Sequence, residues 1–167
     1  TASSSSLPSF NAMQAIANWT FVYLGQVDPM KCYAYGSGLS GGQAGFNTFY
    51  IHAYDEFSHP IVNPEVSFNV YAEGTPYPIS SGVQYKSNGL FSVEYSITSI
   101  GDYKLFVSVN DQQIRNSPWD ITIEPGDLSP FDTTVTGQGS IVADVGFNNY
   151  FFLQLRDRFG NAVRDRN

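Results

Sequence analysis

Apolar positions between residues 31 and 125 recur at every second residue, in short runs separated by clusters of turn-forming residues. The apolar members of five such runs are Phe49, Ile51 and Ala53; Val66, Phe68 and Val70; Phe91, Val93 and Tyr95; Leu105, Val107 and Val109; and Trp119, Ile121 and Ile123. A period of two places one face of a strand against a core and the other toward solvent. With an opening strand near 32–35 and a short one near 83–85, the pattern predicts about seven strands and an all-β, immunoglobulin-like β-sandwich.

Two local signals mark connections between these strands. Asn88-Gly89 is a dipeptide that supports positive φ between paired strands. Gly101-Asp102-Tyr103 opens the strand that carries Leu105, and Phe106 and Ser108 are expected on its outer face. We expect the Tyr103 hydroxyl to bond back across the preceding loop, as the tyrosine corner of sandwiches does.

The first 27 residues follow a different pattern from the rest. Ser9 is a candidate cap for a short helix over 10–17, and the aromatic and β-branched run 19–24 is typical of a strand. Asp28-Pro29 then marks a boundary. We interpret 1–27 as an N-terminal linker or the end of a preceding domain.

Three segments recur about a hundred residues later along the chain. At an offset of 101 positions, Gly36-Ser37-Gly38 recurs as Gly137-Gln138-Gly139, and Ala44-Gly45-Phe46-Asn47 recurs as Val145-Gly146-Phe147-Asn148. At an offset of 102 positions, Asp55-Glu56-Phe57-Ser58-His59 recurs as Asp157-Arg158-Phe159-Gly160-Asn161. A fixed period of this kind indicates a tandem array. Such arrays serve as spacers or binding surfaces more often than as enzymes.

Four motifs fall at matching places in the strand pattern. They are Asp28-Pro29-Met30-Lys31-Cys32 with Gly36-Ser37-Gly38-Leu39 at the first strand, Asn88-Gly89-Leu90-Phe91-Ser92-Val93-Glu94-Tyr95 at the fifth, Gly101-Asp102-Tyr103 at the sixth, and Ile114-Arg115-Asn116-Ser117-Pro118-Trp119 at the entry to the last. Together they resemble the motifs of a filamin-type immunoglobulin-like repeat. Asn116 and Trp119 stand where that family has Gly and Phe, which alters a turn and enlarges a core residue.

The resemblance covers 28–125 fully, and 128–167 as two strands and the start of a third. We therefore divide the chain into 1–27, a filamin-type repeat at 28–126, and the first strands of a second, incomplete repeat at 127–167. Two or three strands cannot bury both faces of a sandwich. Either the chain is a piece of a longer array, or a neighbouring chain completes the second repeat by strand addition.

Charge and cysteine content narrow the classes of partner. A net charge of −7 with three lysines argues against nucleic acid and anionic membrane surfaces, which bind through Lys and Arg. No apolar run is long enough to predict a membrane span. Cys32 is the single cysteine, so no internal disulfide is expected, which fits a reducing compartment.

Few residues suggest chemistry. The two histidines, His52 on an outward strand position and His59 in the next loop, belong to no nucleophile motif. The Asp55-Glu56 and Asp157–Asn161 loops offer oxygen ligands for calcium, but they lack the alternating aspartates of a calcium loop, which favours a turn capped by Asp. We expect no enzyme activity, no cofactor and no metal site.

The resemblance implies one interaction site. In filamin-type repeats the third and fourth strands flank a groove that takes up a partner peptide as an added strand, using unpaired backbone groups for affinity. The third strand is expected at 65–72 and the fourth at 79–86, with Pro76 and Pro78 between them. The candidate peptide-binding residues at this edge are Ser67, Asn69, Tyr71, Val83 and Tyr85.

Two cellular settings remain open. Asn18-Trp19-Thr20 is an N-glycosylation sequon, and with the low charge it favours a cell-surface or extracellular array that mediates adhesion or assembles into fibres. The lone cysteine favours the alternative, a cytoplasmic filamin-like rod that links actin filaments or docks partner peptides. In both settings we expect protein partners or self-assembly through sheet edges.

Overall fold

The computed structural model describes residues 25–142 and 145–163, and this part of the chain is built almost entirely from strands. The elements are β1 (Tyr33–Tyr35), η1 (Ser37–Leu39), β2 (Gly41–Gln43), β3 (Gly45–His52), β4 (Phe68–Glu73), β5 (Ser80–Ser87), β6 (Leu90–Ile97), β7 (Gly101–Val109), β8 (Gln112–Gln113), β9 (Trp119–Glu124), β10 (Thr134–Thr136), η2 (Gln138–Ser140) and β11 (Phe152–Gln154). The two η elements are single 3₁₀ turns. None of the described elements is a helix long and apolar enough to span a membrane.

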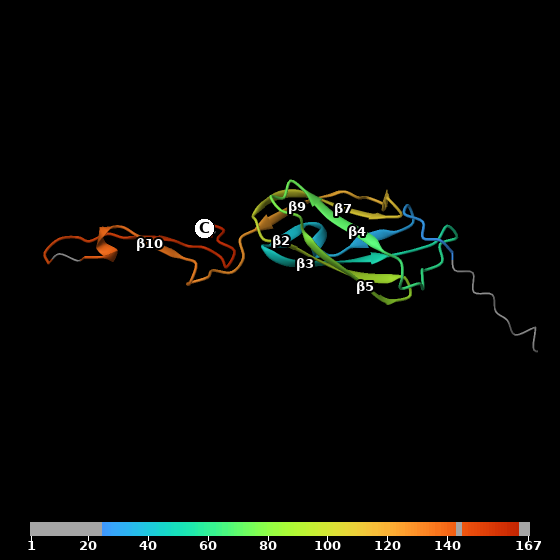
Figure 1. The fold of residues 1–167 in the computed structure, drawn as a ribbon, viewed down its shortest axis with the longest axis horizontal. Coiled ribbons are helices and arrows are strands. Elements are labelled where there is room, and N and C mark those ends of the chain that lie inside the picture. Colours follow the sequence, from blue (N-terminus) through green and yellow to red (C-terminus); the bar gives the residue numbers. More distant parts are fainter. Residues whose placement is uncertain (1–24, 143–144, 164–167) are drawn as a thin grey trace, which may run out of the picture.

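Two sheets form the sandwich between β1 and β9. One has the strand order β1-β3-β6-β5, and the other has the order β2-β9-β7-β4 with β8 paired to β7. All pairings are antiparallel except the one between β2 and β9. Figure 1 shows the two sheets lying against each other, with β4 and β5 as end strands of the two layers. The immunoglobulin-like sandwich that the alternation predicts is confirmed.

The core lies between the two sheets and consists of the predicted apolar faces. Its largest fully buried side chains include Tyr95, Phe49, Phe91, Ile51 and Leu105. The Tyr95 hydroxyl donates to the carbonyl of Gly38 over 2.5 Å, so the one polar group of this ring is satisfied inside the core. Burial raises the pKa of Tyr95 to about 12.

The outer face of β7 differs from the expectation. Phe106 and Ser108 were expected to face solvent, but both are buried. The ring of Tyr71 on the neighbouring strand β4 stacks on Phe106, with centroids 4.8 Å apart and planes 3° apart. The β8 residue Gln113 pairs with Ser108. A cross-strand partner and a short extra strand therefore cover this face.

Two predicted turn features are confirmed. Asn88 and Gly89, between β5 and β6, have φ of 46° and 78°, as a tight hairpin turn requires. The Tyr103 hydroxyl lies 3.0 Å from the carbonyl oxygen of Ser99 and 3.1 Å from that of Ile100. It closes the β6–β7 loop as a tyrosine corner does.

The short strands β2 and β8 were not predicted. β2 reads Gly-Gly-Gln and has no apolar side chain to mark it. Gly41, with φ 96°, lies so close to β9 that a Cβ would be 2.0 Å from the Thr122 carbonyl oxygen. A glycine is therefore required for this parallel pairing.

The elements after Pro125 reproduce the start of the sandwich and extend from one of its ends (Figure 1). β10 pairs with β11 in the register Thr136↔Phe152, as β1 pairs with β3 in the register Tyr35↔Tyr50. Phe151 and Leu153 stand 102 positions after the core residues Phe49 and Ile51. They are 55% and 56% exposed, against 0% for Phe49 and Ile51. In the described residues this second unit therefore has the inner face of one sheet without the sheet that would cover it.

Candidate functional site

The end strands of the two sheets, β4 and β5, lie on the same side of the sandwich and next to each other. β4 ends one sheet and β5 ends the other. The Ser81 hydroxyl of β5 donates to the carbonyl of Val70 in β4 over 3.3 Å. The two edges are thus close enough at this point for one side chain to bridge them.

The free edge of β4 is formed by alternate backbone groups. In an antiparallel strand the N–H and C=O of one residue point to the same side, and the next residue points to the other side. The carbonyl of Val70 accepts from the Ser81 hydroxyl, and the carbonyl of Ala72 accepts from the Thr75 hydroxyl at 3.5 Å. Both donors lie outside β7, so these two carbonyls point away from β7. The backbone groups of Val70 and Ala72 therefore face the edge, and those of Asn69 face β7.

The candidate edge residues do not share one surface. Ser67 precedes β4 rather than belonging to it, Asn69 is exposed, and Tyr71 stacks on Phe106. Val83 and Tyr85 are half-buried and pack against the core, where Tyr85 meets the edge of Phe91 at 5.2 Å. The structure thus places three of these residues on or beside the outer face of one sheet and two on the inner face of the other.

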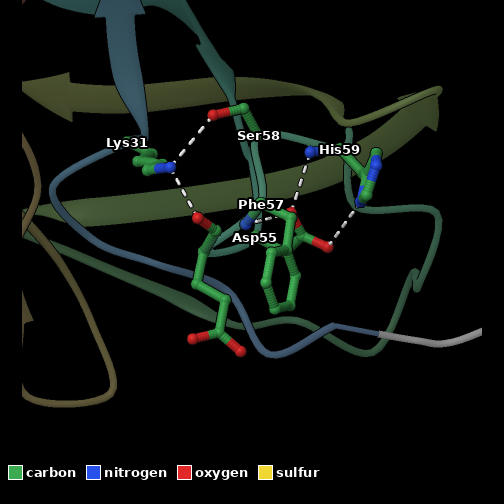
Figure 2. Close-up of polar contacts among 6 residues, drawn as sticks. Lys31, Asp55, Phe57, Ser58 and His59 are labelled. Atoms are coloured by element: carbon green, nitrogen blue, oxygen red, sulfur yellow. Dashed lines mark hydrogen bonds and ion pairs between the residues drawn. The ribbon is translucent and has the colours of Figure 1, made fainter.

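A buried aspartate organises the loop after β3. Asp55 is 2% exposed, and its Oδ1 accepts the N–H groups of Phe57 (2.9 Å) and His59 (2.8 Å). Its Oδ2 lies 3.2 Å from His59 Nδ1 (Figure 2). Lys31 Nζ donates to the Glu56 carbonyl at 2.5 Å and to Ser58 Oγ at 3.0 Å. The loop is therefore the Asp-capped turn that the sequence favours over a calcium site.

The second copy of this loop joins the two units of the chain. Asp157 is fully buried, and its Oδ1 accepts the N–H groups of Phe159 and Asn161, both at 2.9 Å. Its Oδ2 accepts the N–H of Gly126, in the connection after β9, at 2.9 Å. The Asn161 amide donates both to this oxygen and to the carbonyl of Thr98 in the first sandwich, each at 2.8 Å.

Packing reinforces these bonds. The guanidinium of Arg158 lies 4.7 Å from the centroid of the Phe159 ring. Both side chains lie against Gly45 at the start of β3, where a Cβ would be 3.2 Å from Arg158 Nη2 and 3.5 Å from the Phe159 ring. We call the contacts of Asp157, Arg158, Phe159 and Asn161 with Gly45, Thr98 and Gly126 the joint.

Both aspartates are held in their charged form. Burial alone would raise the pKa of Asp55 and of Asp157, but the hydrogen bonds that each carboxylate accepts outweigh burial. The pKa of each is therefore below its ordinary value. Asp55 is bound by donors of its own loop, and Asp157 by donors of its own loop and by Gly126 in the connection, so the two carboxylates stabilise their turns.

Other reactive groups are dispersed. His52 lies in a row of stacked rings on the outer face of β1 and β3, away from His59 in its loop. Cys32 is fully buried, and burial raises the pKa of its thiol to about 11. Within 25–142 and 145–163, no three His, Cys, Asp or Glu side chains are grouped so that they could hold a metal ion. Asn18 lies outside the described residues.

Sequence reasoning did not identify the joint. The 102-residue offset marked the Asp157 loop, but the bond from Asn161 to Thr98 spans 63 positions and has no local signal.

Comparison with solved structures shows the same architecture in known proteins. The Lin-41 filamin domain matches with a TM-score of 0.52 and 14% identity, over 60% of this chain and 98% of that domain. The Escherichia coli adhesin FdeC matches with a TM-score of 0.58 and 15% identity, over 81% of this chain and 43% of that one. Invasin, a bacterial integrin-binding protein, matches with a TM-score of 0.54 and 12% identity, over 83% of this chain and 28% of that one. This chain thus spans less than half of either adhesin chain, and at these identities the likeness is one of fold.

The sequence itself matches a family model. The model of the Filamin/ABP280 repeat matches residues 26–120, which is more than half of the chain and includes all strands of the first sandwich up to the start of β9. The motifs at Asp28, Asn88, Gly101 and Ile114 all lie within that match. The chain belongs to the filamin repeat family.

Proposed function

We propose that this chain is a non-enzymatic structural and protein-interaction segment of a longer cell-surface or extracellular array, which mediates adhesion or fibre assembly. The joint carries the proposal. Hydrogen bonds and packing connect the Asp157 loop to Thr98, Gly126 and Gly45, so one repeat is attached to the next by more than the linker. A rigid series of sandwiches is suited to holding a binding surface at a distance.

The same geometry supports a division of the chain into domains. We assign 28–126 to one filamin-type repeat and 127–167 to the first strands of a second, with 1–27 as a linker or the end of a preceding domain. The exposed Phe151 and Leu153 support a second sandwich that is completed by strands equivalent to β4–β9. Those strands come either from further sequence of the same polypeptide or from a neighbouring chain by strand addition.

The extracellular setting rests on composition and on the kind of protein that shares the fold. Low charge and the sequon at Asn18 favour it. FdeC is an adhesin and invasin is an integrin-binding protein.

Antibody access on intact cells of the native source tests the setting. An antibody raised against 28–126 should label intact cells, and glycopeptide mapping should find a sugar on Asn18. Labelling only after permeabilisation, together with an unmodified Asn18, would refute the proposal and favour a cytoplasmic rod.

The alternative is a cytoplasmic filamin-like rod that docks partner peptides by strand addition, and the free edge of β4 is the observation that favours it. Proline at Ala72 removes an edge N–H and leaves the β4–β7 bonds in place, whereas proline at Asn69 would break them. Peptides selected from a displayed library on the native chain should lose binding to Ala72→Pro and keep binding to Ala72→Gly. Equal binding to both variants would exclude strand addition at β4.

A further inference from the structure

The outer face of the sheet β1-β3-β6-β5 contains a shallow hollow of about 330 Å³. Its lining residues come from three neighbouring strands: Thr48 and Tyr50 from β3, Ser92, Val93 and Glu94 from β6, and Gly82, Gln84 and Lys86 from β5. The register places Tyr50 opposite Ser92 and Ser92 opposite Gln84, so these three residues form one row across the sheet. Thr48, Glu94 and Gly82 form the adjacent row.

Tyr50 forms one wall of the hollow. Its ring stacks on Tyr35 of β1, with centroids 5.6 Å apart and planes 27° apart, so one ring face is covered from the β1 side. On the opposite side its neighbour is Ser92, a small residue, and Tyr50 as a whole is 38% exposed. The second face of the ring is thereby open toward the hollow. Tyr35 in turn stacks on His52 at 5.8 Å, which supports the wall from behind.

Gly82 makes the hollow possible. A Cβ at this position would meet nothing within 4 Å, and its φ lies outside the left-handed region, so the backbone does not require a glycine here. Glycine inside a strand costs stability relative to residues with a side chain. The missing side chain leaves space directly beside Glu94, its cross-strand neighbour.

The floor and rim offer hydrogen-bonding groups that the rest of the described chain does not use. In the part of the chain that the structure describes, the side chains of Thr48, Ser92 and Glu94 make no hydrogen bond or ion pair. The Lys86 ammonium donates to Gln84 Oε1 at 2.9 Å, which leaves the Gln84 amide hydrogens available. One carboxylate and one ammonium give the hollow no net charge.

We propose that this hollow binds a sugar ring of a neutral oligosaccharide. A pyranose ring has an apolar C–H face that can lie on an aromatic ring, and its rim carries hydroxyls that both donate and accept. The open face of the Tyr50 ring suits the apolar C–H face of the sugar. The sugar hydroxyls can bond to the side chains of Thr48, Gln84, Ser92 and Glu94. Since the hollow has no net charge and the whole chain carries −7, the chemistry favours a neutral glycan over a sulfated or otherwise anionic one.

The test is a titration of the ¹⁵N-labelled chain with neutral hexasaccharides of β-1,4-glucose, β-1,4-N-acetylglucosamine, α-1,4-glucose and α-mannose, and with heparin as the anionic arm. At least one neutral glycan should shift the amide signals of residues 48–50, 82–86 and 92–94. Shifts confined to other residues, binding of heparin alone, or no shift with any of the four neutral glycans would overturn the proposal. The inference depends on the hollow and not on the cellular setting, so it can fail while the proposed function stands.

Two variants separate binding in the hollow from changes in folding. Gly82→Val places a branched side chain in the hollow at a position where a Cβ meets nothing within 4 Å, and valine suits a strand. We expect it to keep or raise stability and to weaken glycan binding at least roughly tenfold. Ser80→Val, two positions away on the same strand face and outside the hollow, is the control and should bind as the native chain does. Tyr50→Ala should weaken binding by about tenfold through loss of the aromatic wall. Native-like binding by Gly82→Val would show that the glycan binds elsewhere.

Discussion

At the scale of single residues, Tyr103 shows how one hydroxyl stabilises a connection. The side chain is buried beneath the loop that it closes, and it donates to the carbonyls of Ser99 and Ile100. Burial, and then the charge of Asp102, raise the pKa of Tyr103, so the hydroxyl stays protonated as a donor. We expect Tyr103→Phe to lower the free energy of unfolding by about 1 kcal/mol, because both carbonyls lose this donor.

Urea unfolding followed by tryptophan fluorescence would measure this loss. Tyr77→Phe is the matched control, since Tyr77 is 74% exposed, and it should leave the unfolding midpoint unchanged. Equal midpoints for the native chain and Tyr103→Phe would contradict the structural role of the hydroxyl.

The two loop aspartates predict an acid-sensitive fold. Their native pKa values are below the ordinary 3.8, so the folded chain binds fewer protons than the unfolded chain in acid. Their contribution to stability is therefore complete at pH above about 5 and is lost as the pH falls through and below 3.8. Urea midpoints measured across this range should drop in acid, and the drop should be smaller in Asp55→Asn with Asp157→Asn. An undiminished acid drop in the double variant would assign the effect to other carboxylates.

At the scale of elements, the turn before β9 depends on a left-handed residue. Asn116 has φ 68°, a conformation that Asn and Gly adopt more readily than other residues. This explains why Asn can stand where the family has Gly. We expect Asn116→Ala to destabilise the chain by about 1 kcal/mol and Asn116→Gly to be close to neutral, both measured by thermal unfolding. A loss of equal size in the two variants would mean that the Asn side chain, rather than φ, matters.

Elements could be predicted where their own sequence shows the pattern, and not where a distant segment decides the structure. β3, β4, β6, β7 and β9 were predicted because each buries an alternating apolar face that is visible in its own sequence. β2 was missed because its pairing needs the absence of a side chain at Gly41, and the burial of Phe106 was missed because Tyr71 covers it from another strand. The inward orientation of Val83 and Tyr85 was also missed, since it follows from the pairing of β5 with β6 and not from composition.

At the scale of the whole molecule, the period in the sequence becomes a repeated geometry. The offset of about a hundred residues relates β1 to β10, η1 to η2 and the Asp55 loop to the Asp157 loop. The repeat could be predicted from the sequence because similar residues recur at a fixed spacing. The joint could not be predicted in this way, because it depends on Asn161, which stands where the first copy has His59. That difference allows the second loop to reach the Thr98 carbonyl through an amide.

The orientation of the second unit should therefore depend on Asn161. Asn161→Ala removes the bond to Thr98 and one donor to Asp157, while the Gly126 bond and the packing of Arg158 and Phe159 on Gly45 remain. We expect a joint weakened by about 1 kcal/mol, in which the first sandwich and residues 128–162 reorient more independently. Residual dipolar couplings measure this reorientation directly. One alignment tensor should fit both units in the native chain, and also in the control Asn69→Ala, whose exposed side chain lies on β4. The Asn161→Ala variant should require two tensors. If a single tensor still fits Asn161→Ala, packing around Gly45 rather than the amide bridge holds the repeats together, and Phe159→Ala, which removes the ring that lies against Gly45, becomes the variant that should separate them.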